Sequence, residues 1–147
     1  MQYTEILEGT DAWLAARLLR PDQLNLCQAD ISTSGSDAIK IRVYDISAET
    51  PDPDSAGGGL AYTQDVSSSA GADHNIILLA ATSSALVNDG YWNGTDDDGY
   101  NFLYRLEYAN AALKGGHRYR AEFHIKTTSY GTVIWVAGLY VRSMLLT

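Results

Sequence analysis

The sequence predicts an all-β protein built as a single antiparallel β-sandwich. Several runs alternate apolar and polar side chains with period two, which is the pattern of strands with one buried face. Gly-rich or Asn/Asp-rich stretches separate these runs, as in the short connections between antiparallel strands. The 147 residues suffice for one domain with a hydrophobic core. We count seven to eight short strands, a number typical of an immunoglobulin-like or jelly-roll sandwich.

The chain is expected to begin with an arm and then enter the sandwich. The segment 1–9 is short and polar and ends in Gly9, so we assign it to an N-terminal arm. The β-sandwich domain then spans residues 10–147. Residues 10–20 mix Ala and Leu in a pattern that also suits a short helix. The turn signal Arg20-Pro21-Asp22 that follows favours a strand.

The middle of the chain predicts three strands separated by loops. Residues 39–45 form the clearest strand of the N-terminal half, and the Pro- and Gly-rich segment 51–59 is expected to be a flexible loop. A short strand follows near residues 60–63, and the apolar run 76–81 is typical of a strand buried on both faces. Residues 88–90 carry a tight-turn signal. The inward side chains of the strand 39–45 are expected to be Ile39, Ile41 and Val43.

An antiparallel meander of three strands is expected between Asp96 and Leu145. The first two strands each have one aromatic and aliphatic face, made of Tyr100, Phe102, Tyr104 and Leu106 in one and of Tyr119, Ala121, Phe123 and Ile125 in the other. The third strand is apolar on both faces, with Val133, Trp135, Ala137, Leu139 and Val141 on one and Ile134, Val136 and Tyr140 on the other. Such a strand is either central in a two-layer packing or meets another protein chain.

This two-faced strand supplies the predicted interface. We expect Trp135 or Tyr140 to lie near a subunit or capsid contact, with Val136 and Ile134 as further candidates.

The charge of the chain argues against two classes of partner. Ten Lys and Arg against 18 Asp and Glu give a net charge of −8, whereas nucleic-acid binding needs clustered cations. The apolar runs 76–81 and 133–141 are too short or too interrupted for a membrane helix. The N-terminus lacks the basic start and long apolar run of a secretory signal. We therefore expect no nucleic acid, no membrane and no signal-peptide secretion.

The sequence contains no motif that predicts an enzyme. No Gly-x-Ser-x-Gly motif is present, and Gly57-Gly58-Gly59 lacks the Gly-Lys-Ser/Thr ending of a phosphate loop. Cys27 is the one cysteine, so an intrachain disulfide is excluded, and we expect it to be a small buried apolar residue. We predict no catalytic residue and no cofactor.

Metal binding is also not expected. The three histidines lie far apart without ligand spacing: His74, His117 and His124. The acidic run Asp96, Asp97 and Asp98 is a weak calcium candidate, because calcium prefers several oxygen ligands on a flexible loop. A solvated hairpin turn uses the same residue types and is the favoured interpretation.

Tyr91 and Trp92 are the candidates for glycan contact. Exposed aromatic rings in a loop stack on sugars in carbohydrate-binding modules. The favoured alternative is that Trp92 caps one end of the sandwich core.

Parts of the sequence resemble small β-sandwich proteins encoded among bacteriophage structural genes. The phrases that carry this resemblance are Ala16-Arg17-Leu18-Leu19-Arg20, Leu26-Cys27-Gln28-Ala29-Asp30-Ile31, Ile41-Arg42-Val43-Tyr44-Asp45, Asp98-Gly99-Tyr100-Asn101-Phe102 and Gly115-Gly116-His117-Arg118-Tyr119-Arg120-Ala121-Glu122-Phe123. The resemblance implies a virion component with an immunoglobulin-like sandwich and no catalytic residues. Proteins of this kind include capsid decoration (cement) proteins and tail or baseplate adaptors.

Our leading hypothesis is a bacteriophage capsid decoration protein. It would bind the major capsid protein on the outer surface of the head as a homo-oligomer, with a trimer as the expected state, and stabilise the head by binding energy alone. It would be assembled in the host cytoplasm and reside in the virion. The alternatives are a tail, neck or baseplate adaptor of the same fold, or a carbohydrate-binding module that uses Tyr91 and Trp92.

Overall fold

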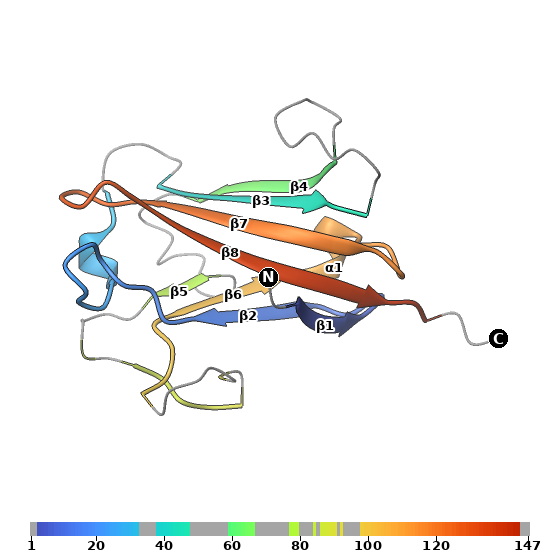
Figure 1. Cartoon of the computed structure of the whole chain (residues 1–147), viewed down its shortest axis with the longest axis horizontal. Helices are drawn as coiled ribbons and strands as arrows, with labels where there is room; N and C mark the ends of the chain where they lie inside the picture. The colour runs from blue at the N-terminus through green and yellow to red at the C-terminus, as the bar shows by residue number, and fades with distance from the viewer. Residues whose placement is uncertain are drawn as a thin grey trace.

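Two β-sheets that face each other make up the described part of the chain (Figure 1). This computed structural model describes residues 3–32, 38–47, 59–66, 77–79, 84, 86–90, 92 and 98–144. The larger sheet contains, in spatial order, β1 (Tyr3–Leu7), β8 (Thr132–Arg142), β7 (Arg118–Lys126), β3 (Ile39–Asp45) and β4 (Leu60–Val66). The smaller sheet contains β2 (Ala12–Ala16), β6 (Phe102–Leu106) and β5 (Ile77–Leu79). The predicted all-β sandwich is confirmed.

Two short helical segments accompany the strands. A 3-10 helix, η1 (Gln28–Asp30), lies between β2 and β3 along the chain, and a single-turn α-helix, α1 (Tyr108–Ala111), follows β6. Among the described residues, no helix is long and apolar enough to cross a bilayer.

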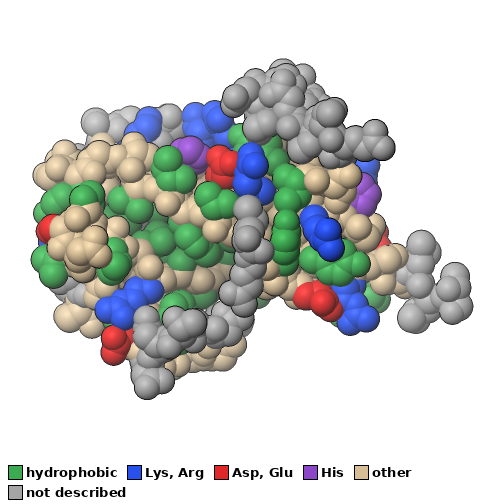
Figure 2. All heavy atoms as spheres, viewed as in Figure 1, with side chains coloured by type: hydrophobic (Ala, Val, Ile, Leu, Met, Phe, Trp, Pro, Cys, Tyr) green, Lys and Arg blue, Asp and Glu red, His purple; other side chains and the backbone are tan. Residues whose placement is uncertain are grey.

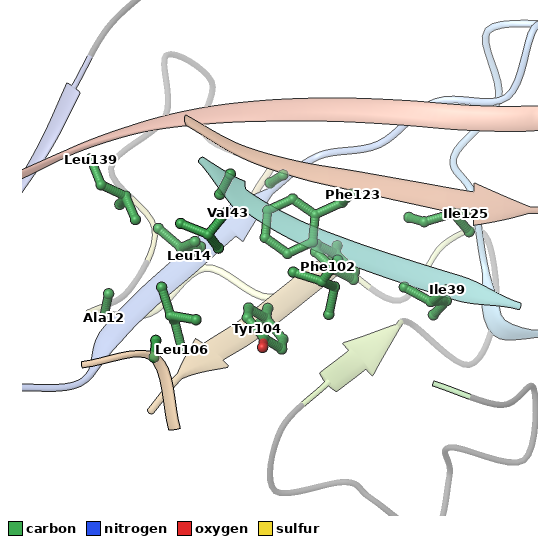
Figure 3. Packing of buried hydrophobic residues seen from close by; sticks show 14 of the residues in the cluster. Ala12, Leu14, Ile39, Val43, Phe102, Tyr104, Leu106, Phe123, Ile125 and Leu139 are labelled. Carbon is green, nitrogen blue, oxygen red and sulfur yellow. The ribbon is translucent and has the colours of Figure 1, made fainter. Parts of the chain in front are cut away.

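The core lies between the two sheets and is built from alternating side chains. The predicted strand 39–45 is β3, and its inward residues Ile39, Ile41 and Val43 are buried as expected. From the smaller sheet, the rings of Phe102 and Tyr104 meet the ring of Phe123 edge-on, each with ring centroids 5.4 Å apart (Figure 3). Edge-to-face packing of this kind adds stabilisation beyond the burial of apolar area.

The predicted three-stranded C-terminal meander is wrong. β7 and β8 do form an antiparallel hairpin, but β6 pairs with β2 and β5 in the opposite sheet. After β6 the chain passes through α1 and crosses to the larger sheet (Figure 1). The alternation of Phe102, Tyr104 and Leu106 predicts one buried face correctly. The same alternation results whichever sheet contains the strand, because both sheets bury one face against a shared core.

The segment assigned to an N-terminal arm contains a strand instead. β1 lies at the edge of the larger sheet and pairs in parallel with residues 138–142 of β8. The sandwich is therefore not entirely antiparallel. The segment looks polar because it is an edge strand, on which Ile6 alone packs against the core.

The segment 10–20 contains strand β2 at Ala12–Ala16, as favoured, and a buried amide holds the chain that follows the strand. Asn101 is 2% exposed. Its Oδ1 accepts a bond from the N–H of Leu18 at 2.7 Å, and its Nδ2 donates to the carbonyls of Leu18 and Leu26, each at 2.8 Å. These bonds fix the loop that leads from β2 to η1, because buried backbone groups need partners.

The remaining segment predictions fall partly outside the described residues. The turn signal 88–90 is confirmed, since the N–H of Trp92 donates to the carbonyl of Asp89 at 3.0 Å. The short strand near 60–63 is part of β4, and the run 76–81 contains β5. Of the loop 51–59, residues 51–58 lie outside the described residues.

Candidate interaction surface on strand β8

β8 presents apolar side chains to solvent on the outer face of the larger sheet. The strand has 11 residues, and no charged side chain occurs from Thr132 to Val141. Its outer face exposes Ile134 to 56% and Val136 to 41%. Figure 2 shows hydrophobic side chains gathered in the region where Figure 1 draws the first half of this strand. A continuous apolar group of this kind is a feature of interaction surfaces.

Trp135 belongs to the other face of the same strand. Its indole stacks on the ring of Phe123, with centroids 4.9 Å apart, and meets Phe102 edge-on at 5.8 Å. Val133 and Ala137 also pack against the core. Of the predicted interface residues, the structure therefore places Ile134 and Val136 on the outer face and Trp135 on the inner face.

Tyr140, the fourth predicted interface residue, is half-buried where β1 flanks β8. Arg118 lies between two rings, with its Cζ 5.8 Å from the ring centroid of Tyr140 and 5.6 Å from that of Tyr3. Arg142 pairs with Glu5 at 3.2 Å. The second half of β8 thus has partners for its aromatic and charged groups within the chain.

The first half of β8 is open on one side. β7 pairs with β8 from Thr132 to Tyr140, whereas β1 pairs with β8 only from Gly138 to Arg142. Within the described residues, the stretch 132–137 therefore has a neighbouring strand on the β7 side alone. An edge strand of this kind presents unpaired backbone donors and acceptors.

The backbone direction at this edge follows from two hydrogen bonds farther along the strand. The carbonyl of Arg142 accepts from the N–H of Glu8 on the β1 side, at 2.9 Å. The N–H of Val141 donates to the carbonyl of His117 on the β7 side, at 3.0 Å. Successive residues of a strand direct their N–H and C=O groups to opposite sides. The residues of the open stretch that share the orientation of Arg142 are Thr132, Ile134 and Val136.

Charged side chains border the apolar residues and pair with one another. Ile134 lies opposite His124 in the β7–β8 register, and Val136 lies opposite Glu122. The Glu122 carboxylate lies 3.2 Å from Nε2 of His124 and 2.7 Å from Nε of Arg120. The opposite charges of Arg120 and Glu122 therefore pair within β7, one strand away from the open edge.

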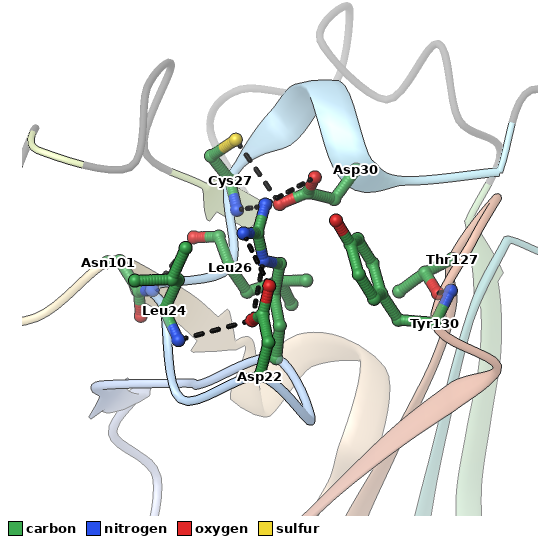
Figure 4. A network of polar contacts seen from close by, with 9 residues as sticks. Asp22, Leu24, Leu26, Cys27, Asp30, Asn101, Thr127 and Tyr130 are labelled. Carbon is green, nitrogen blue, oxygen red and sulfur yellow. Dashed lines mark hydrogen bonds and ion pairs between the residues drawn. The ribbon is translucent and has the colours of Figure 1, made fainter.

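A polar network holds the hairpin from which β8 begins (Figure 4). The guanidinium of Arg20 pairs with Asp22 at 2.8 Å and Asp30 at 3.4 Å, and its Cζ lies 4.7 Å from the ring centroid of Tyr130. In the hairpin, Oγ1 of Thr127 accepts from the N–H of Tyr130 at 2.9 Å. The loop after β2 is thereby attached to the turn that precedes the open edge. The segment Arg20-Pro21-Asp22 carries a turn signal in the sequence, but no local pattern indicates the contact between Arg20 and Tyr130.

Cys27 is buried, as predicted, and also takes part in a polar contact. Its thiol donates to Oδ2 of Asp30 at 3.3 Å, and its backbone N–H donates to the same oxygen at 3.0 Å. Burial, followed by the hydrogen bond to Asp30, raises the pKa of the Cys27 thiol above its ordinary value. The Cys27 thiol therefore ionises less readily than the thiol of a solvent-exposed cysteine.

The described histidines each pair with one carboxylate. Nδ1 of His117 lies 2.6 Å from Oδ2 of Asp45, and His124 pairs with Glu122. No group of three or more His, Cys, Asp or Glu side chains that could hold a metal ion occurs among the described residues. His74 lies outside them.

The calcium and glycan candidates are only partly described. Asp98 is exposed and pairs with Arg17 at 2.9 Å, while Asp96 and Asp97 lie outside the described residues. Trp92 lies against Tyr100, with ring centroids 6.3 Å apart and an interplanar angle of 43°. Tyr91 also lies outside the described residues.

Comparison with known proteins gives no relative for this chain: no protein-family model, no curated protein and no solved structure matches it.

Proposed function

We propose that this chain is a non-enzymatic bacteriophage virion protein that decorates the outer surface of the head. It binds the major capsid protein as an oligomer and stabilises the shell by adding contacts. The resemblance to small phage β-sandwich proteins gives the class, and the apolar outer face of β8 is the observation that carries a binding role. Ile134 and Val136 are exposed without an evident role in the fold of the monomer.

The arrangement of charge supports a surface-bound structural part. The chain has a net charge of −8, and the charged groups beside β8 form pairs within the chain. An acidic protein stays soluble before assembly and docks on a basic or mixed surface. The uncharged stretch of β8 then provides a contact between copies of the oligomer that excludes water.

The stabilising mechanism requires only binding energy. A protein that contacts neighbouring capsid subunits buries area at each contact, and that area must be exposed again before the subunits separate. Binding to the assembled state alone shifts its equilibrium against opening, by mass action. The strength of the effect rises with the free concentration of the decorating protein relative to its dissociation constant.

The test is cosedimentation with heads of the phage whose genome encodes the chain. Heads that lack the protein are mixed with increasing amounts of it, pelleted, and analysed for saturable binding and for DNA retention on heating. The proposal expects saturation at a fixed ratio to capsid protein and improved DNA retention. Absence of binding to heads would contradict the decoration role. Binding only to purified tails would indicate a tail, neck or baseplate adaptor instead.

A further inference from the structure

We propose that two copies of this chain join through the open edge of β8, with their residues 132–136 paired as antiparallel strands. The two larger sheets then form one continuous sheet across a two-fold axis. This inference rests on the proposed function in one respect, because both use β8 for self-association. It replaces the expected trimer with a dimeric contact.

The backbone of the open stretch has the groups that such pairing needs. Thr132, Ile134 and Val136 share the strand orientation of Arg142, whose carbonyl is bonded on the β1 side. Their N–H and C=O groups therefore point to the edge at which no described strand lies beside them. A second strand at this edge would supply about six hydrogen bonds, two for each of three facing pairs of residues.

The side chains fit a register centred on Ile134. In that register Ile134 faces Ile134 of the second copy, and Thr132 faces Val136 of the second copy. On the inner face, Val133 faces Trp135 of the second copy. Every facing pair includes an aliphatic side chain, and cross-strand pairs of aromatic and β-branched residues stabilise sheets. Trp135 would thus lie beside the contact although its indole packs in the core.

The distribution of charge favours a second copy of this chain as the occupant. Each copy carries a net charge of −8, so most surfaces of two copies repel each other. The stretch from Thr132 to Val141 is free of charge and can face its own copy without a like-charge contact. Edge strands that must stay single commonly carry Lys, Pro or an inward charge, and this stretch has none of them.

Two-fold pairing also closes the assembly. An isologous contact uses the same surface on both copies, so each copy occupies the open stretch of the other. An uncharged apolar edge that remained exposed would instead be a site at which strands of other chains could add, which leads to aggregation.

The side-chain test compares two lysine variants by sedimentation velocity over a wide concentration range. Ile134→Lys places a charge on the proposed axis, and Thr63→Lys places the same charge on an exposed position of β4, at the opposite edge of the sheet. We expect the unaltered chain and Thr63→Lys to form the same dimer. Ile134→Lys should weaken the dimer about a hundredfold, because both copies carry the change.

The backbone test uses the unaltered chain and so does not depend on the folding of a variant. Amide hydrogen exchange is measured at low and high protein concentration. The amides of Ile134 and Val136 should exchange more slowly as the dimer forms. The amide of Trp135 is the internal control, because it points to β7 and is protected at every concentration.

Three results overturn the inference: a monomer at all concentrations, a dimer or trimer that Ile134→Lys leaves intact, or exchange at Ile134 and Val136 that does not change with concentration. These failures are separable from failure of the proposed function. A monomer that saturates phage heads contradicts the pairing and leaves the decoration of the head standing. A dimer that depends on Ile134 and never binds heads contradicts the decoration role alone.

Discussion

The indole of Trp135 stacks on the ring of Phe123 with centroids 4.9 Å apart and an interplanar angle of 27°. Its neighbour Ile134 points the opposite way and is 56% exposed. One step along β8 therefore separates a side chain that stabilises the fold from one that is available for contact.

Alanine substitutions at these two neighbours should have different effects. Trp135→Ala removes a large ring from the core and should lower the free energy of unfolding by about 3 kcal/mol. Ile134→Ala should change the stability of the monomer by less than about 1 kcal/mol, because the side chain is exposed. Urea unfolding at low protein concentration measures both. Equal losses would show that Ile134 is a core residue and would remove the basis for the contact surface.

The buried amide of Asn101 should be a major local determinant of stability. Asn101→Ala removes the side-chain partner of the Leu18 N–H and of the Leu26 carbonyl. The Leu18 carbonyl loses one of its two donors and keeps the N–H of Leu26. We expect a loss of about 3 kcal/mol in the free energy of unfolding, since each buried unsatisfied group is costly. Asn110→Ala, in an exposed helix, is the control and should change stability by less than about 0.5 kcal/mol. A loss at Asn101 no larger than at Asn110 would contradict the assigned role.

Cys27 should react slowly with alkylating reagents in the folded chain. Its raised pKa leaves little thiolate at pH 8, and burial restricts access. We expect iodoacetamide to modify the folded chain at least about tenfold more slowly than the urea-unfolded chain. Asp30→Asn should increase the rate, because it removes the negative neighbour of the thiol. Equal rates in the folded and unfolded chains would contradict a protected thiol.

Asp22 should contribute to stability in a manner that depends on pH. The hydrogen bonds from Arg20, whose Nη2 lies 2.8 Å from Oδ2 of Asp22, hold the pKa of that carboxyl below its ordinary value. The ionised Asp22 carboxylate therefore stabilises the folded state. This stabilisation is complete above the ordinary pKa of an Asp carboxyl, about 4, and is lost as the pH falls through the lowered pKa of the folded state. Asp22→Asn should therefore reduce stability slightly at pH 7 and leave it unchanged at about pH 2.

Urea unfolding at both pH values measures the effect at Asp22. Asp65→Asn, at an exposed carboxylate 3.9 Å from Lys40, is the matched control for loss of one surface charge. The free energy of unfolding of Asp22→Asn should approach that of the unaltered chain as the pH falls. If the gap between the two grew toward low pH instead, the stabilising role of the Arg20–Asp22 ion pair would be contradicted.

Strict alternation made β3 and β7 predictable from sequence. Ile39, Ile41 and Val43 and the facing side chains of β7 repeat with period two, and each run is bounded by turn residues. The same signal failed for β1, which has one inward side chain, Ile6, packed against the core. Its partner β8 lies at the opposite end of the sequence, so no local pattern marks the pairing.

The assignment of strands to sheets needed the three-dimensional structure. Phe102 and Phe123 lie on strands with similar alternation, yet they belong to opposite sheets and face each other across the core. Likewise, the apolar residues of β8 were evident from the sequence. That residues 132–137 have, within the described part of the chain, a neighbouring strand on one side alone was not evident from it. The extent of this open stretch follows from the register of β1, whose first described residue, Tyr3, pairs with Gly138.

The most direct test of the decoration role is the copy number of this protein in the purified phage particle, measured by quantitative gel analysis and located by electron cryomicroscopy. We predict hundreds of copies on the outer surface of the head. A dozen copies or fewer at the tail or neck, or none in the particle, would contradict it.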